Sequence, residues 1–224
     1  MRTRGVYVTG TDTGIGKTVA SCALLHALRA SGVDAVGMKP VASGCEQTQG
    51  GWRNEDALAL IEASAVRHDY ALHNPFALPA ATAPQLAARD AGVTVSLDPI
   101  QKAYAALQAQ SDAVVVEGVG GWAAPLADGL EQADLVRALG LPVVMVVGLR
   151  LGCLNHARLT LQAINPTALA VVGWIGSTVD PEFDRLDDYL ALLRDALPVP
   201  CLGVLSHGDD PARMASALDV TPLL

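Results

Sequence analysis

Short apolar runs, many of them β-branched, recur along the 224-residue chain, and stretches with helical spacing separate them. The runs occupy residues 5–10, 34–40, 112–118, 141–148, 168–176 and 199–205. Residues 17–32 and 185–198 are two of the stretches with a helical pattern. Continuous apolar strands joined by helical crossovers predict an α/β fold. We therefore expect one domain over residues 1–224, a doubly wound, mainly parallel sheet with helices on both faces.

The segment from Val41 to Ser96 departs from this alternation, because it contains no strong strand pattern. Residues 43–56 form a glycine-rich loop, and residues 73–90 carry three prolines. Ligands of such sheets bind outside the carboxyl ends of the strands. A long irregular insertion after the second apolar run is therefore placed to build a substrate site or a lid.

Composition and charge narrow the class of protein. Apolar residues make up 51% of the chain and charged residues 17%, which indicates a globular protein. The formal net charge of -8 argues against nucleic-acid binding along a basic surface. No apolar run is long enough for a membrane span or a signal peptide, and the four cysteines form no C-x-x-C pair. We expect a cytoplasmic protein with reduced thiols that binds neither nucleic acid nor membrane.

The segment VTGTDTGIGKT, residues 8–18, combines a strand end, three glycines and a Lys-Thr pair at the start of a helix. Backbone N–H groups can hold a phosphate there, Lys17 can reach the β- and γ-phosphates, and the Thr18 hydroxyl can bind Mg²⁺. The usual motif has four residues between its outer glycines, whereas five separate Gly10 from Gly16. An incidental glycine-rich turn does not explain why all these features coincide. We predict a phosphate-binding loop and hence a P-loop NTPase-like fold.

Three charged residues are candidates for phosphoryl chemistry. Glu117 ends an apolar run at the expected ligand edge, and a burial argument favours a metal ligand over a solvated acid there. Asp56 follows Asn54, a plausible helix cap, and fits a metal ligand and an acid facing the helix dipole equally well. Lys39 ends the second run, where it can neutralise a transferring phosphoryl group or remain a solvated lysine.

Other residues give weaker signals. The segment from Leu151 can hold a carboxylate at a helix N-terminus, or be an ordinary helix entry capped by Asn155. None of the five histidines is expected to bind a metal. Trp52, Trp122 and Trp174 can line an apolar site, although core packing is the default for such residues.

Together these segments resemble dethiobiotin synthetase, a family of biotin biosynthesis. The resemblance is carried by VTGTDTGIGKTVASCALLHAL (8–28), KPVASG (39–44), RNEDALAL (53–60), YALHNPFALP (70–79), VVVEGVGGW (114–122), VVGLRLGCLNHARLTLQ (146–162) and GWIGSTVDP (173–181). It implies ATP-dependent ring closure of 7,8-diaminononanoate with CO₂ or bicarbonate, through a carbamate and a carbamic-phosphoric anhydride. It also implies Mg²⁺, ATP as co-substrate, and a homodimer with sites at the interface.

The resemblance further implies a role for each matching residue. The catalytic group is Lys39, Lys17 and Thr13, and the metal ligands are Thr18, Asp56 and Glu117. Nucleotide contacts fall on Gly14, Ile15, Gly16, Lys17, Thr18, Val19, Asp56, Glu117, Gly118, Val119, Gly120, Ser177, Thr178, Ser206, His207 and Gly208. Substrate contacts fall on Thr13, Ser43, Gly152, Cys153 and Asn155.

Two positions depart from the family pattern. Many members have asparagine at the position of Ser177, and a serine forms fewer hydrogen bonds to a base edge. We therefore expect relaxed nucleobase selection, with CTP or GTP competing with ATP. Gly14 stands where some relatives carry an acidic residue, which leaves the detail of the phosphate contacts open.

Two other P-loop classes are alternatives. A cobyrinate-type amidating synthetase normally carries an additional glutamine-hydrolysing domain, for which 224 residues leave no room. A partitioning-type switch ATPase has a signature lysine five residues before the loop lysine, and this chain has Asp12 there. A switch should also hydrolyse nucleotide without a small substrate, whereas a ring-forming synthetase should need one.

Overall fold

The computed structural model describes residues 5–224, and residues 1–4 of the predicted domain lie outside the described residues. The strands are β1 (Gly5–Gly10), β2 (Ala35–Met38), β3 (Val41–Ser43), β4 (Glu46–Thr48), β5 (Gly51–Arg53), β6 (Phe76–Leu78), β7 (Ala113–Glu117), β8 (Val143–Leu149), β9 (Val171–Thr178) and β10 (Cys201–Leu205). The α-helices are α1 (Lys17–Ala30), α2 (Glu55–Ala63), α3 (Tyr70–His73), α4 (Pro84–Asp90), α5 (Leu97–Gln108), α6 (Gln132–Leu139), α7 (Cys153–Ile164), α8 (Leu186–Ala196) and α9 (Pro211–Met214). The 3₁₀ helices are η1 (Asn165–Thr167), η2 (Ala215–Ala217) and η3 (Thr221–Leu223).

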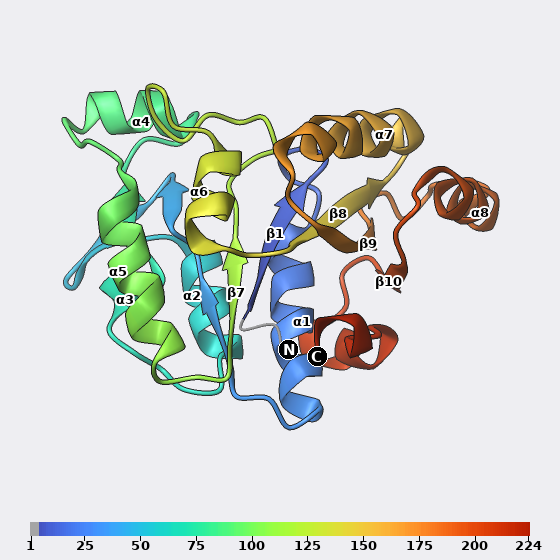
Figure 1. The fold of residues 1–224 in the computed structure, drawn as a ribbon, viewed down its shortest axis with the longest axis horizontal. Coiled ribbons are helices and arrows are strands. Elements are labelled where there is room, and N and C mark those ends of the chain that lie inside the picture. Colours follow the sequence, from blue (N-terminus) through green and yellow to red (C-terminus); the bar gives the residue numbers. More distant parts are fainter. Residues whose placement is uncertain (1–4) are drawn as a thin grey trace.

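Six of these strands form one parallel sheet in the order β10-β9-β8-β1-β7-β2. Each of the six predicted runs overlaps one of them, so the predicted parallel α/β fold is confirmed. The strand order reverses at β1, whose neighbours are β7 and β8. A crevice at such a reversal, outside the carboxyl ends of the strands, is the usual ligand site. Figure 1 shows the arrowheads of β1 and β7 at the same edge of the sheet.

Helices cover both faces of this sheet. Successive residues of a strand point to opposite faces, so each buried strand packs against helices on both sides. On one face Val6 and Val8 belong to a buried cluster with residues of α1, α2 and α9. On the other face Tyr7 joins a cluster with α5 and α6, and the residues of β8 and β9 on that side pack with α7 and α8. A fully buried aliphatic side chain contributes about 1.5–3 kcal/mol of hydrophobic stabilisation. These two layers therefore hold rigid the sheet edge from which the candidate residues project.

The insertion after β2 is more regular than the sequence predicts. No strong strand is expected in residues 41–96, and the segment contains four short ones, of which β3 pairs with β6 in parallel and β4 pairs with β5 as a hairpin. These strands are three residues long, and β4 is exposed, so no apolar alternation marks them. Thr48 closes the hairpin by donating its hydroxyl to Gly51 O at 2.8 Å. The insertion is thus a small folded unit beside the carboxyl end of β2.

No helix within residues 5–224 is both long and apolar enough to cross a membrane. All four cysteines are free thiols. The division of the chain into a single domain stays a prediction.

Candidate active site

The loop between β1 and α1 has the backbone of a phosphate cradle. Gly14 and Gly16 have φ angles of 70° and 81°, in the left-handed region that favours glycine. A side chain at Gly16 would also clash with the Ser177 hydroxyl. Gly16 is the N-cap of α1 and has no side-chain cap, so the first N–H groups of the helix are free to bind an anion.

The longer spacing of the loop has a structural reason. A Cβ at Gly10 would lie 2.9 Å from Cδ of Lys17, so glycine at this position leaves room for the lysine stem. Thr11 N–H donates to Val146 O at 3.0 Å, and its hydroxyl accepts from Gly148 N–H at 3.4 Å. The extra residue therefore extends the pairing of β1 with β8 before the loop turns.

Lys17 lies under this loop and is 7% exposed. Its Nζ donates to Asp12 O at 2.8 Å. Burial, reinforced by the charge of Lys39, lowers the pKa of Lys17 to about 8, although nearby carboxylates oppose the shift. Because this pKa lies close to neutral pH, a nearby charge can change the protonation of Lys17. An anion bound in the loop would stabilise its ammonium form.

Lys39, Asp56 and Glu117 form one charged cluster at the carboxyl edge of the sheet. Lys39 Nζ lies 2.5 Å from Glu117 Oε1 and 2.9 Å from Asp56 Oδ2. Glu117 is fully buried and the Lys39 side chain is 4% exposed. Burial alone would lower the pKa of Lys39, but the two carboxylates outweigh it and raise the pKa. Lys39 thus stays an ammonium, and the alternative of a solvated loop lysine does not describe its placement.

Thr18 joins the two acids from the loop side. Its Oγ1 donates to Glu117 Oε1 at 3.0 Å, and the same hydroxyl helps to lower the pKa of Asp56. Burial would raise the pKa of Asp56, but the charge of Lys39 and hydrogen bonds from Lys39 and Thr18 lower it. Asn54 caps α2 by accepting from Ala57 N–H at 3.2 Å, as predicted, and Asp56 follows in the first turn.

These oxygen atoms fit a hard cation such as Mg²⁺. Glu117 Oε2 is buried and has no hydrogen-bond partner in the protein, which is costly unless a ligand uses it. A hydroxyl and carboxylates are oxygen ligands, and Mg²⁺ usually completes its shell with phosphate oxygens and water. Over the described residues, no group of three His, Cys, Asp or Glu side chains could hold a metal without such additional ligands.

Several residues predicted to contact the nucleotide, among them the expected nucleobase contact Ser177, lie on the β9 and β10 side of the loop. Ser177 is 6% exposed and lies against Gly16. His207 Nδ1 lies 3.2 Å from Thr178 O, which brings the exposed segment 206–208 beside the end of β9. On the opposite side, residues 118–120 follow β7, and a Cβ at Gly120 would lie 3.6 Å from Thr13 Oγ1.

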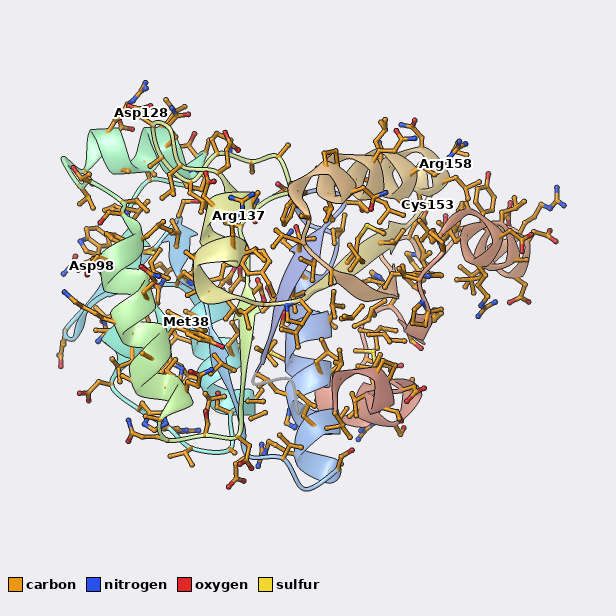
Figure 2. The ribbon with its side chains drawn as sticks, viewed as in Figure 1. Met38, Asp98, Asp128, Arg137, Cys153 and Arg158 are labelled. Atoms are coloured by element: carbon orange, nitrogen blue, oxygen red, sulfur yellow. The ribbon has the colours of Figure 1, made fainter. Side chains whose placement is uncertain are left out.

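The predicted substrate residues have mixed surroundings. Thr13 is exposed and Ser43 half-buried, and the Ser43 carbonyl accepts from Asn54 Nδ2 at 3.4 Å. The reading of Asn155 as a helix cap is wrong, because Gly152 is the N-cap of α7 and Asn155 lies exposed in the first turn. Cys153, labelled in Figure 2 on α7, is 0% exposed, so its thiol packs in the core. Of the tryptophans, Trp174 and Trp122 are buried and Trp52 is 40% exposed.

Sequence reasoning missed two contacts that shape the site. Asp12 accepts from Arg150 Nη2 at 2.6 Å and from Thr13 N–H at 2.7 Å, which ties the loop to the end of β8. Buried Gln132 accepts from Tyr7 OH at 2.6 Å and donates to Gly121 O at 2.5 Å, which holds the loop after Glu117. The one available signal was the tyrosine within an apolar strand, because a buried hydroxyl needs a partner.

Two surface features lie away from this cluster. A cavity of about 1010 Å³ lies at the opposite end of the sheet, beside Gly5, Pro142 and Leu224. Asp128, labelled in Figure 2 next to α4, forms an exposed ion pair with Arg89 at 2.6 Å. Neither contains the polar cluster that phosphoryl transfer requires.

Comparison with known proteins agrees with the site. A family model described as an AAA domain matches residues 4–214. The chain is 61% identical to the ATP-dependent dethiobiotin synthetase BioD of Xanthomonas oryzae over 217 residues, 97% of each chain. The protein of the same name from Xanthomonas campestris is 65% identical over 197 residues, 88% of each chain, and that of Xylella fastidiosa is 60% identical over 215 residues, 95% of each.

Solved structures show the same fold at low identity. The chain resembles the signal recognition particle receptor FtsY of Elizabethkingia anophelis in complex with GDP, with a TM-score of 0.52 and 13% identity. The match covers 97% of this chain and 63% of the receptor chain. This likeness shows the P-loop NTPase-like fold alone.

Proposed function

Because the chain belongs to the dethiobiotin synthetase family, we propose that it makes dethiobiotin from 7,8-diaminononanoate, CO₂ and a nucleoside triphosphate. The observation that carries the proposal is the cluster of Lys39, Asp56 and Glu117 against Thr18 of the phosphate-binding loop. It combines a fixed ammonium with oxygen ligands at one sheet edge, which phosphoryl transfer needs. No protein nucleophile is required, because the substrate supplies both amines.

The proposed reaction has three steps. One amine of the substrate adds to CO₂, which forms an N–C bond and releases a proton to give a carbamate. A carbamate oxygen then attacks the γ-phosphorus of ATP, the bond to the β–γ bridging oxygen breaks, and ADP leaves. The second amine attacks the carbamoyl carbon, phosphate leaves with the electrons of the C–O bond, the attacking nitrogen releases a proton, and the cyclic urea closes. Holding the two amines and the phosphate in line supplies much of the rate acceleration.

The residues divide this work by position. The N–H groups of the loop and Lys17 hold the β- and γ-phosphates. Lys39, kept charged by two carboxylates, stabilises negative charge on the transferring phosphoryl group. Mg²⁺, held by Thr18, Asp56 and Glu117, would supply further positive charge when bound. We assign Thr13, whose hydroxyl lies beside Gly120 after β7, to positioning the carbamate.

We also propose a cytoplasmic homodimer that forms through α7. Leu151 is 78% exposed and Leu159 is 55% exposed, which is unusual for large apolar side chains on one short segment. Leu154, Asn155, Arg158, Leu159 and Gln162 line a shallow groove on the same helix. In a dimer through this face, the N-terminus of α7 with Gly152, Cys153 and Asn155 would hold the substrate carboxylate.

The test combines the protein with Mg²⁺, bicarbonate and 7,8-diaminononanoate, and measures phosphate and dethiobiotin with ATP, CTP and GTP in turn. Phosphate release should depend on the diamine, and one dethiobiotin should form per phosphate. Phosphate release without the diamine, at the same rate, would contradict the proposal and favour a nucleotide switch. Glu117→Gln is the matched loss-of-function variant, because it keeps the side-chain shape and removes the charge.

A further inference from the structure

We propose that Tyr70 and Asn74, in the segment between α2 and β6, are positioning residues that hold Lys39 and Asp56 together for phosphoryl transfer. The proposal rests on the proposed function and assigns a task to part of the insertion. In the described structure, neither side chain hydrogen-bonds the Lys39 ammonium or the carboxylates of Asp56 and Glu117. Both act through the backbone that carries the cluster.

The first branch of this network fixes the backbone of Lys39. The β2 strand ends at Met38, so the peptide groups of Lys39 leave the sheet while the residue stays 3% exposed. Its N–H donates to His73 O at 2.7 Å, and its carbonyl accepts from Asn74 Nδ2 at 2.6 Å. Buried backbone groups need such partners, because leaving one unpaired costs about 1–3 kcal/mol. Residues 73 and 74 therefore supply the hydrogen-bond partners that a neighbouring strand would otherwise give to the backbone of Lys39.

The second branch reaches the helix that carries Asp56. Tyr70 OH accepts from Asn54 N–H at 2.9 Å and donates to Asn74 Oδ1 at 2.8 Å. Asn54 is the N-cap of α2, and Asp56 lies two residues later. The Tyr70 hydroxyl is thus the point where the start of α2 is joined to the amide that holds Lys39.

The geometry explains why the cluster needs this bridge. Glu117 is aligned with Lys39 by the sheet itself, because Met38 and Val116 are paired in neighbouring parallel strands. Asp56 has no such alignment, since α2 is attached to the sheet by packing. The packing is close, because a Cβ at Gly37 would lie 2.7 Å from Cβ of Leu60. Packing fixes where α2 lies, and the directional bonds of Tyr70 fix the end of the helix that presents the carboxylate.

The orientation of the Asn74 amide agrees with this reading. Its Nδ2 faces two acceptors, Lys39 O and Phe76 O, and its Oδ1 faces the Tyr70 hydroxyl. The Tyr70 ring is held independently, because the Arg53 guanidinium lies 4.0 Å from its centroid. Replacing Tyr70 by phenylalanine therefore removes the two hydrogen bonds and keeps the ring in place.

The experiment compares Tyr70→Phe with Tyr104→Phe. Tyr104 lies on α5, and its hydroxyl accepts from Gln108 Nε2 at 3.1 Å, so the control also loses a hydrogen bond. Tyr70→Phe should lower kcat roughly three- to tenfold, while the Kd of a non-hydrolysable ATP analogue without magnesium changes less than about twofold. The same variant should reduce the gain in affinity that Mg²⁺ gives. Tyr104→Phe should match wild type in all three measurements.

A second background tests whether Tyr70 acts through Asp56. In an Asp56→Asn protein, the effect of Tyr70→Phe on kcat should shrink, because the positioned carboxylate is already gone. An equal fold loss in both backgrounds, or an equal loss in Tyr104→Phe, would overturn the proposal. The magnesium-linked affinity does not depend on turnover. If wild type forms no dethiobiotin, the proposed function fails, and an unchanged magnesium response in Tyr70→Phe then shows separately that the positioning is wrong.

Discussion

Lys39→Met should destabilise the protein strongly, because it leaves a buried carboxylate without its cation. Glu117 is 0% exposed, and its Oε1 is bonded by Lys39 at 2.5 Å and by Thr18 at 3.0 Å. After the substitution only the Thr18 hydroxyl remains. Removing one partner of a buried ion pair costs about 3–5 kcal/mol. The second carboxylate adds little, because the Asp56 side chain is 36% exposed and can be rehydrated.

Urea unfolding followed by circular dichroism measures this loss. With a slope of about 2–3 kcal/mol per molar urea, a loss of 3–5 kcal/mol lowers the midpoint by about 1–2.5 M. The variant should also lose about 10²–10³-fold in kcat, because a fixed positive charge at the phosphoryl group is gone. The experiment needs no ligand for the stability measurement, so the two effects can be read separately.

The double variant Lys39→Met/Glu117→Gln is the control for the charge argument. It removes both charges and keeps an amide oxygen that can accept from Thr18, so its stability should return to within about 2 kcal/mol of wild type. It should nevertheless remain inactive. A Lys39→Met midpoint equal to wild type, or a double variant as unstable as the single one, would falsify the reasoning that burial makes this pair interdependent.

Four further predictions concern binding and specificity. The pKa of Lys17, about 8, should rise when a triphosphate binds, so that binding takes up a proton above pH 8. Nucleotide affinity should then fall as the pH rises above 8, by up to about tenfold per pH unit. Calorimetry in two buffers of different ionisation enthalpy measures the proton uptake, and no uptake at pH 8.5 would contradict the prediction. Thr13→Val should lower turnover more than nucleotide affinity, and equal losses in kinetic and binding assays would indicate a plain phosphate cradle. Asn155→Ala should raise the KM for the diamine and leave nucleotide binding nearly unchanged, so unaltered diamine kinetics count against its role. Ser177→Asn should raise the ratio of kcat/KM for ATP over CTP about three- to tenfold, and a wild type already selective for ATP would refute relaxed base selection.

The fold could be predicted because its signals are local and strong. The strands β1, β7 and β8 are mainly apolar segments that are buried on both faces of the sheet. A strand buried in this way appears in the sequence as a nearly continuous apolar run, which can be recognised without the structure. The hairpin of β4 and β5 could not be predicted in this way. Its strands are three residues long and bury no alternating face, so they are specified by pairing and by the turn near Gly51.

The members of the charged cluster could be proposed singly, but their mutual contacts could not. Lys39 and Glu117 are 78 positions apart in the sequence, and only the strand order puts β2 beside β7. Without the strand order, the sequence cannot show whether Lys39 and Glu117 form an ion pair or are two separate solvated side chains. The same limit applies to Asp12, whose pairing with Arg150 depends on β1 lying next to β8. That pairing gives the residue a structural task at the place where a switch ATPase has its signature lysine.

The extra residue of the phosphate-binding loop connects the fold to the chemistry. Thr11 continues the hydrogen bonding of β1 to β8, so the chain turns one residue later than its first glycine suggests. Asp12 then offers its carbonyl to Lys17 and its carboxylate to Arg150. Thr13 consequently lies beside Gly120, whereas Gly16 lies against Ser177. A loop that only cradled phosphate would need no side chain there, and this placement is why Thr13 should affect turnover more than nucleotide affinity.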